Sequence, residues 1–277
     1  MPEGLAPLEL RPRPSRSAEW TFVVLAFVLA SLFYAGTQPI NRFEGSLIPA
    51  EVGADGTVYR EMASRFPRDL PPRGIAPYVF RIGTPAVAAV VAKSFGWVIT
   101  AGFDRVNLVF NFLSIILMAL LLRRHVESVP VRCLLIGVAL IVPYAPMRLV
   151  SFHPLIADAA ALVLMASGAM LLDRLHDRPS RGTSIALALL VAGGVCFHEI
   201  VLVVAIAALW SRARVIEHRT WLPLLGGAVS LAIIHQWVIV EGPTPSTAAD
   251  AWQWLTAKSP LTLALALAMV GGPLLAI

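Results

Sequence analysis

Charged residues are scarce in this sequence of 277 residues. Asp, Glu, Lys and Arg make up only 14% of the chain, whereas 57% of the residues are hydrophobic and the mean hydropathy is +0.75. Soluble domains carry about a quarter charged residues. The shortage of charge excludes a water-soluble globule, a disordered chain and a collagen-like fibre. It indicates that most of the chain is solvated by lipid.

Cysteine is also nearly absent, and several catalytic motifs are missing. The two cysteines, Cys133 and Cys196, fall at opposite ends of their predicted spans, so we expect no disulfide framework. The sequence has no phosphate-binding Gly-x-x-x-x-Gly-Lys loop and no Gly-x-Ser-x-Gly elbow. His198-Glu199 lacks the second histidine of a zinc-protease helix, because position 202 is Leu. These absences argue against a nucleotide-driven engine, a serine hydrolase of this type and a zinc protease.

The apolar runs predict an all-α, polytopic bundle of about eight transmembrane helices. A bilayer core about 30 Å thick needs about 20 apolar residues per helix. Six runs meet or approach this length: Trp20–Gly36, Val106–Leu122, Cys133–Val150, Leu155–Leu172, Trp221–Val240 and Leu261–Ile277. The run from Ser184 to Trp210 is too long for one span. We interpret it as two short helices that meet at Phe197-His198-Glu199, because a charged pair within a single span is costly.

The positions of arginine agree with this threading. If the amino terminus is cytoplasmic, every cytoplasmic segment carries three arginines and the short outer turns carry almost none. The cytoplasmic arginines are Arg11, Arg13 and Arg16; Arg123, Arg124 and Arg132; Arg174, Arg178 and Arg181; and Arg212, Arg214 and Arg219. The net charge of +5 is therefore explained by loop orientation, and no nucleic-acid partner is predicted. We expect an integral protein of a bacterial inner membrane.

The domain organisation is simple. Residues 1–19 are rich in Pro and Arg and predict a loose cytoplasmic tail, and residues 20–277 form the transmembrane domain. Within this domain, the outer loop 37–83 is the one sizeable hydrophilic stretch, and its length favours a functional role. Thr84–Ala101 is apolar, yet a crossing here would move all later arginines outside, and Lys93 lies at its centre. We therefore expect a re-entrant or interfacial outer helix in this segment.

Polar groups gather at the predicted outer face. Ionisable groups inside or beside a span are costly, and by default they mark a functional site. They come from the long loop, from two outer turns and from the outer ends of two spans: Asp55, Tyr59, Arg81, His153, Asp158, His198, Glu199 and His235. The sequence therefore predicts one polar site at the outer membrane boundary.

Structural explanations stay open for these residues. Asp55 is also suited to cap a short helix. Asp158 needs a partner on an apolar span, and Arg148 or Arg81 would serve. Glu199 fits a solvated turn. The other structural explanations are an interface anchor for Arg81, a turn residue for His153 and an interhelical hydrogen bond for His235.

Four sequence elements occur in an order found in a known family. They are Asp55–Ala63, Ala76–Pro85, Ala157–Ala159 and Phe197–Glu199. Over roughly residues 20–210 the chain resembles the polytopic GT-C-type glycosyltransferases of bacteria. The order of the elements and their shared outer face carry this resemblance.

The resemblance implies transfer of a sugar from a polyprenyl-phosphate donor to a hydroxyl of an acceptor glycan, lipid or protein. Asp55 matches the general base of the family, since a carboxylate can accept the proton of the attacking hydroxyl. Arg81 is the expected partner of the leaving lipid phosphate. The other six residues named above are expected to bind substrate. Asp158, Glu199 and His235 also have the chemistry to hold a divalent metal, whose presence stays open.

Two other functions stay open. A transporter would carry ionisable residues near the bilayer midplane and would have pseudo-symmetric halves, and neither feature is evident in the sequence. A non-catalytic membrane scaffold would use the same polar groups as structural pairs. For the enzyme, Asp55, Arg81, Asp158 and Glu199 are expected to line one outward-facing cavity.

Overall fold

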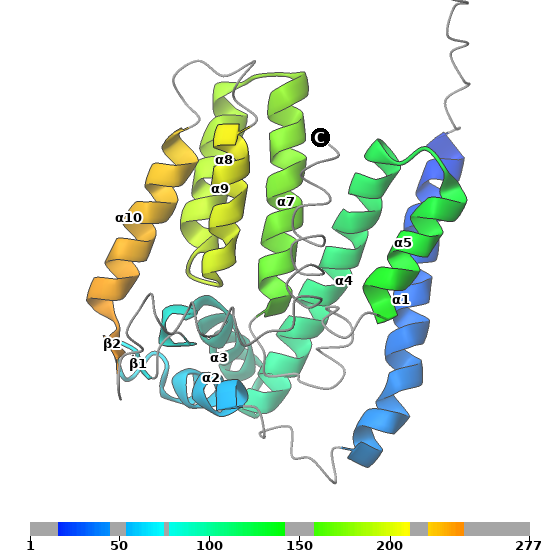
Figure 1. The fold of residues 1–277 in the computed structure, drawn as a ribbon. Helices are drawn as coiled ribbons and strands as arrows, with labels where there is room; N and C mark the ends of the chain where they lie inside the picture. Colours follow the sequence, from blue (N-terminus) through cyan, green and yellow to red (C-terminus); the bar gives the residue numbers. More distant parts are fainter. Residues whose placement is uncertain (1–15, 45–53, 75–77, 142–157, 211–220, 241–277) are drawn as a thin grey trace, which may run out of the picture.

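We describe the fold from a computed structural model, which defines residues 16–44, 54–74, 78–141, 158–210 and 221–240. The described residues are mostly helical and form no closed sheet (Figure 1). The all-α prediction is therefore confirmed for this part of the chain. Both cysteines, Cys133 and Cys196, are free thiols, as the sequence predicts.

Nine α-helices are defined in the described residues. They are α1 (Arg16–Glu44), α2 (Ala54–Arg65), α3 (Gly83–Phe95), α4 (Ile99–His125), α5 (Val129–Ile141), α7 (Asp158–Asp177), α8 (Arg181–Gly194), α9 (Leu202–Trp210) and α10 (Trp221–Trp237). Two single 3-10 turns accompany them, η1 (Tyr78–Phe80) and η2 (Glu199–Val201). Two short parallel strands also pair, β1 (Arg73–Gly74) and β2 (Ile239–Val240).

Three helices are long and apolar enough to cross a membrane. They are α1 over Trp20–Thr37, the whole of α4 and the whole of α7. Four shorter apolar helices, of 10–17 residues, lie within Val129–Ile141, Arg181–Gly194, Glu199–Ala208 and Leu222–Trp237. The described residues thus support a membrane protein with three candidate spans, and the prediction of about eight spans is not confirmed. The predicted span Leu261–Ile277 lies outside the described residues.

The outward faces of the bundle are apolar. On α1, Phe22 and Ala26 are buried against a core that includes Ile115 of α4, whereas Val24 and Leu32 are largely exposed. Further exposed apolar side chains lie on α5, α8 and α10: Leu134, Val138, Ile141, Ile185, Leu189, Val229 and Ile233. So many exposed apolar side chains on several helices are unfavourable in water and favourable in lipid. This surface supports the membrane assignment.

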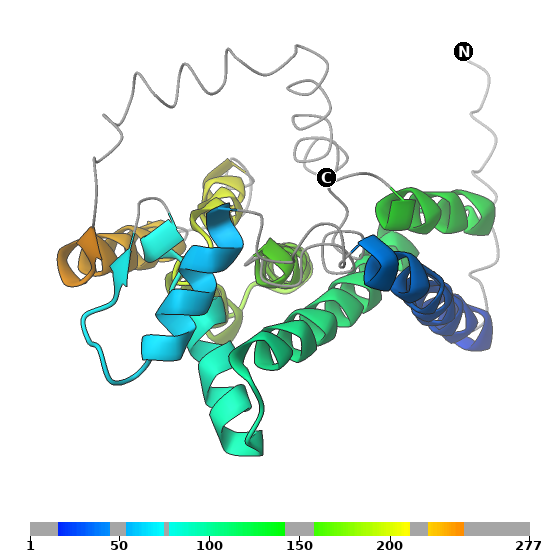
Figure 2. The same ribbon diagram turned by 90° about the horizontal axis from the view of Figure 1, so that it is seen from below.

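Helix α4 joins two groups of helices. It packs against α1 and α5 on one side and against α7 on the other, and α7 to α10 form the second group (Figures 1 and 2). Close helix approach in the second group depends on small residues. For example, a Cβ atom added at Gly227 of α10 would lie 2.5 Å from the side chain of Leu202. Gly227 thus acts as a close-packing position between α10 and α9.

Helices α2 and α3 lie across one end of the bundle (Figures 1 and 2). The same end, which we call the site end, carries the start of α7, the turn between α8 and α9, and the end of α10. Helix α1 ends at Glu44 and α2 begins at Ala54, so the predicted loop 37–83 is partly helical.

The outer helix predicted for Thr84–Ala101 is α3. It ends earlier than predicted, at Phe95, because Gly96 has a φ of 67°, a left-handed conformation that glycine adopts without strain. Lys93 donates to the backbone carbonyl of Phe66, which ties α3 to the end of α2. This contact explains why a lysine lies at the centre of the apolar segment Thr84–Ala101, where it argued against a membrane crossing.

The opposite end of the bundle carries arginine. Six arginines of the predicted cytoplasmic segments lie there, in the last turns of α4 and α7, in the first turns of α5 and α8, and in the link between α7 and α8 (Figure 1): Arg123, Arg124, Arg132, Arg174, Arg178 and Arg181. We call this the arginine end. The predicted break at Phe197-His198-Glu199 is present between α8 and α9. This break turns the chain back at the site end and keeps the arginines together at the other end.

Candidate functional site

Five predicted site residues form a continuous set of side-chain contacts at the site end. Tyr59 comes from α2, Arg81 from the segment between η1 and α3, and Asp158 is the first residue of α7. His198 and Glu199 lie in the turn between α8 and α9. We call these five residues the polar cluster. Its members come from four segments that are distant in sequence.

The strongest contact in the polar cluster joins Arg81 and Glu199. Arg81 donates from Nε to Oε2 of Glu199 at 3.0 Å and from Nη2 to Oε1 at 2.5 Å. Two parallel bonds of this kind fix both groups in one plane and are stronger than neutral hydrogen bonds. The Arg81 side chain is only 15% exposed, whereas that of Glu199 is 42% exposed. The cation is therefore the more buried partner.

Tyr59 supports Arg81 from the other side. Arg81 Nη1 donates to the Tyr59 hydroxyl at 3.4 Å, and Tyr59 is fully buried. The Tyr59 ring meets the ring of Tyr78 edge to face, with 5.9 Å between the centroids. Because these aromatic rings are fixed by packing, the guanidinium has a defined position that does not depend on Glu199 alone.

The ion pair changes the acidity of both groups. Burial acts to lower the pKa of Arg81, but the hydrogen bond to Glu199 and the nearby Tyr59 and Glu199 outweigh it, so the pKa rises above its ordinary value. Burial acts to raise the pKa of Glu199, which lies outside the three candidate spans. The hydrogen bond from Arg81 and the charge of Arg81 outweigh burial here as well, and they lower that pKa. Both groups are therefore charged at neutral pH.

His198 connects Glu199 to Asp158. The Nε2 atom of His198 lies 3.1 Å from Oδ1 of Asp158, and the Nδ1 atom accepts the backbone N–H of Ile200 at 3.2 Å. The neutral tautomer with hydrogen on Nε2 satisfies both contacts. Because Nδ1 is then an acceptor, its 3.4 Å approach to Glu199 Oε2 is not a hydrogen bond. Of the two partners expected for Asp158, Arg148 lies outside the described residues, and Arg81 pairs with Glu199. The described contact of Asp158 is with His198, which the turn at 197–199 brings close.

Gly83 allows the segment that carries Arg81 to pack closely against the turn that carries Glu199. The backbone N–H of Gly83 donates to the carbonyl of Cys196 at 2.7 Å, and a Cβ atom at Gly83 would lie 2.6 Å from the Phe197 ring. Phe197 is in turn held edge-on against Phe110 of α4, at 6.1 Å between the centroids. Any larger residue at position 83 would push the α3 segment away from the turn. Gly83 therefore positions Arg81 against Glu199.

Three predicted site residues lie outside the polar cluster. Asp55 is the second residue of α2, four residues before Tyr59 and thus one helical turn away. The helix begins at Ala54, so Asp55 belongs to its first turn and does not precede the helix as a cap would. His235, near the end of α10, stacks on the ring of Phe80 with 3.8 Å between the centroids. His153 lies outside the described residues.

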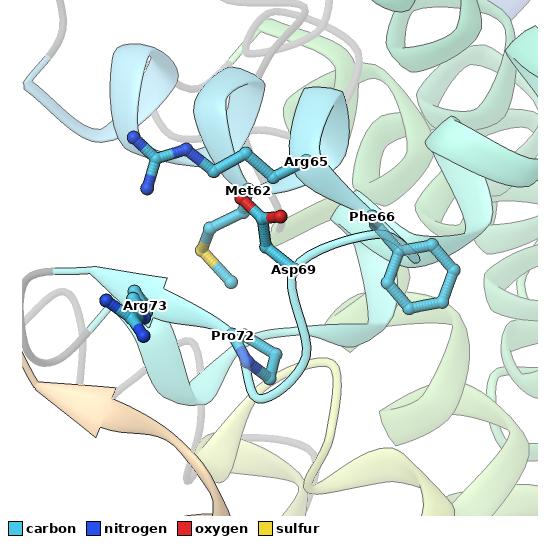
Figure 3. Close-up of a pocket in the computed structure, with 6 residues that line it drawn as sticks. All are labelled: Met62, Arg65, Phe66, Asp69, Pro72 and Arg73. Carbon is cyan, nitrogen blue, oxygen red and sulfur yellow. The ribbon is translucent and has the colours of Figure 1, made fainter.

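The described hollow lies apart from the polar cluster, and no metal set accompanies the cluster in the described residues. A hollow of about 10 Å³, room for about one water molecule, lies between α2 and β1 (Figure 3). Its lining contains no member of the polar cluster: Met62, Arg65, Phe66, Asp69, Pro72 and Arg73. Within the part of the chain that the structure describes, no three His, Cys, Asp or Glu side chains are grouped to hold a metal. The metal ligands considered from the sequence are therefore not brought together there.

Sequence reasoning missed a second charged group, at the arginine end. Asp173 of α7 forms an ion pair with Arg124, whose Nε lies 3.1 Å from Oδ2, and contacts His125 Nε2 at 2.7 Å. Asp177 pairs with Arg124 Nη2. We call these four residues the clamp, because they join the last turns of α4 and α7. The spacing of Asp173 and Asp177, four residues apart on one helix face, was the available signal.

The polar cluster combines a buried guanidinium, an exposed carboxylate, a buried hydroxyl and a hydrogen-bonded carboxylate–imidazole pair. Such a set can bind an anion through the guanidinium and orient hydroxyl groups through the carboxylates. The comparisons with known proteins do not assign a function to it. No protein-family model, curated protein or solved structure matches the chain.

Proposed function

We propose that this chain is a membrane glycosyltransferase. It transfers a sugar from a polyprenyl-phosphate donor to an acceptor hydroxyl at the outer face of a bacterial inner membrane. One observation carries the proposal. Arg81, Glu199, Tyr59 and Asp158 come from distant segments and meet at one end of an apolar bundle, with the guanidinium as the more buried partner of its ion pair.

We assign the orientation of the helix bundle in the membrane from its charge distribution. Arginine-rich ends of membrane helices face the cytoplasm, so the arginine end is assigned to that side. The site end, with α2, α3 and the polar cluster, then faces outward. A lipid-linked donor suits this location, because its tail lies in the membrane and its phosphate lies at the level of the helix ends. No cytoplasmic nucleotide domain is needed for such a donor.

The chemistry assigns a role to each charged group. The acceptor oxygen attacks the anomeric carbon of the sugar, its proton passes to Asp55, and the bond from the anomeric carbon to the phosphate oxygen breaks. The leaving lipid phosphate gains negative charge, which Arg81 stabilises. Asp158, oriented by His198, is suited to hold an acceptor or sugar hydroxyl. The acceptor itself is a glycan, a lipid or a protein.

A non-catalytic scaffold is the second candidate. One observation favours it: the charged members of the polar cluster pair with one another, as they do in a structural network. A scaffold needs Arg81 and Glu199 only for stability, whereas the enzyme also needs Asp55. The two candidates therefore differ in the consequence of replacing Asp55. No observation in the described residues favours a transporter.

The test is sugar transfer by the purified full-length protein, supplied with polyprenyl-phosphate sugars and candidate acceptors. We expect Asp55→Asn to reduce transfer about 100-fold or more, because a general base contributes at least about that factor. Asp69→Asn, which removes an exposed carboxylate from the same predicted outer loop, is the matched control and should retain transfer. Equal transfer by wild-type protein and Asp55→Asn would contradict the assigned base and favour the scaffold.

A further inference from the structure

We infer that Glu199 is an internal substitute for a phosphate, and that a lipid phosphate binds Arg81 by displacing the Glu199 carboxylate. The ligand class, a polyprenyl phosphate, rests on the proposed function. The exchange itself rests on the geometry of the ion pair. It assigns to Glu199 a role that is neither that of a base nor that of a sugar-binding residue.

The geometry of the ion pair suits the exchange. Glu199 presents two oxygens to the Nε and Nη2 edge of Arg81, at 3.0 and 2.5 Å. Two oxygens of a phosphate fit the same fork, because arginine recognises carboxylate and phosphate with one bidentate geometry. The carboxylate and the phosphate therefore compete for one edge of the guanidinium. One anion replaces another, so the charge beside Arg81 stays balanced.

The burial of the two partners determines which of them moves. Arg81 is 15% exposed and Glu199 is 42% exposed. A buried cation without an anion is costly, so Arg81 keeps its need for a partner when Glu199 leaves. The more exposed Glu199 can return to water at a much smaller cost. Glu199 is therefore the mobile member of the pair.

Arg81 keeps its position during the exchange. Its Nη1 atom donates to the buried hydroxyl of Tyr59, and its backbone N–H donates to the carbonyl of Tyr78 at 3.0 Å. Both contacts are independent of Glu199. The guanidinium is thus already oriented when the phosphate arrives, and less conformational freedom is lost on binding.

The surroundings favour a phosphate that is attached to a lipid. Helix α3 begins two residues after Arg81 and ends at an exposed aromatic residue, Phe95. The Phe95 ring stacks on the exposed Trp97, just beyond the helix, with 4.8 Å between the centroids. Exposed aromatic rings at the end of an apolar bundle are typical of the membrane–water interface. A phosphate at the head of a membrane lipid lies at this level. Free phosphate shares the chemistry, and the experiment separates the two sources.

The test measures binding of undecaprenyl phosphate to the full-length protein in detergent micelles, without any sugar. We expect Glu199→Gln to bind it about tenfold more tightly than wild-type protein, because a charged competitor is removed from the fork. Glu61→Gln is the matched control. It removes an equally charged group from an exposed pair with Arg65 on α2, and it should leave the affinity unchanged. Undecaprenol, which lacks the phosphate, should show no difference between the variants.

Each outcome decides the proposal. Unchanged or weaker binding by Glu199→Gln overturns the exchange, and so does equal tightening by Glu61→Gln. If Glu199→Gln tightens only the binding of inorganic phosphate, the lipid assignment is overturned. If Glu199→Gln does not fold, Glu199→Asp keeps the charge, shortens the side chain and should tighten binding about threefold. If Glu199→Gln binds the lipid phosphate more tightly but the protein transfers no sugar, the exchange is supported and the proposed function is overturned. If Glu199→Gln leaves the binding unchanged but sugar transfer depends on Asp55, the proposed function is supported and the exchange is overturned.

Discussion

The polar cluster and the clamp lie at opposite ends of the same bundle and distribute burial in opposite ways. In the clamp the carboxylate of Asp173 is 7% exposed and its partner Arg124 is 43% exposed. In the polar cluster the guanidinium of Arg81 is 15% exposed and its partner Glu199 is 42% exposed. One end thus buries an anion, and the other end buries a cation.

This difference separates a structural contact from a candidate binding site. The clamp joins α4 and α7 through a buried acid that already has two basic neighbours, Arg124 and His125, and needs nothing further. The polar cluster buries a cation whose principal partner is exposed, so a second anion can compete for it. Ion pairs of similar geometry therefore have different functional potential, and burial of the individual partners decides it.

The largest expected effect in this comparison comes from Gly83→Ala. The new Cβ atom would lie 2.6 Å from the Phe197 ring, in the contact that positions Arg81 against Glu199. We expect a loss of about 1–3 kcal/mol in the free energy of unfolding. We also expect tighter lipid-phosphate binding, because the Glu199 carboxylate is moved away from Arg81 while Tyr59 still holds the guanidinium. Thermal unfolding and lipid binding measure the two effects.

Gly137→Ala is the matched control for this substitution. Gly137 lies in α5, with nothing within 4 Å of a new Cβ atom, so the alanine should leave the stability equal or slightly higher. Normal stability and lipid binding in Gly83→Ala would show that the turn at Phe197 moves freely and that Gly83 does not position the polar cluster.

A smaller loss is expected from Arg124→Ala in the clamp. The substitution leaves the buried Asp173 with His125 as its remaining clamp partner, and we expect a loss of about 1 kcal/mol in the free energy of unfolding. Asp177→Ala removes a 54% exposed partner of Arg124 and should change stability by less than about 0.5 kcal/mol. Both variants should bind lipid phosphate as wild-type protein does. Weaker binding in Arg124→Ala would contradict the functional distinction between the two ends.

The smallest expected effect is that of acid on the polar cluster. Burial acts to raise the pKa of Glu199, but the hydrogen bond and charge of Arg81 lower it by more, so the folded pKa lies below the ordinary value of 4.5. The stabilisation by Glu199 is therefore complete above that value and is lost as the pH falls through the folded pKa. Because Glu199 is 42% exposed, we expect a change of about 0.5 kcal/mol or less.

The difference in melting temperature between wild-type protein and Glu199→Gln measures this acid effect. This difference in melting temperature should become smaller as the pH falls below the ordinary pKa of a Glu carboxyl group. A difference that stays constant into the acid range would contradict the assigned role of the Glu199 charge in stability.

Much of the topology could be predicted from the sequence. The long apolar runs predicted helices. The cost of a charged pair within a span predicted the break at Phe197-His198-Glu199. The spacing of arginine predicted which helix ends lie together, because the chain must reverse direction between arginine-rich segments. The number of membrane spans was harder to predict from the sequence. Helices such as α5, with 13 residues, are shorter than one bilayer crossing requires.

The pairing within the site was not predictable in the same way. Glu199 fitted a solvated turn by its sequence context, yet it pairs with Arg81, 118 residues earlier in the chain. Asp158 was expected to pair with an arginine and instead contacts His198. Sequence spacing gives no information on such contacts, because they depend on how α2, α3 and the turn before α9 pack together.

The sequence by itself determined that this protein is helical, apolar and charged at the helix ends, because hydropathy and the cost of burying charge act along the chain. Only the tertiary structure decided which charged group is buried and which is exposed. The close approach at Gly83 and the packing of Tyr59 bury the guanidinium of Arg81 and leave Glu199 toward water. Burial is a property of packed segments, and it decides whether an ion pair only stabilises the fold or can also bind a ligand.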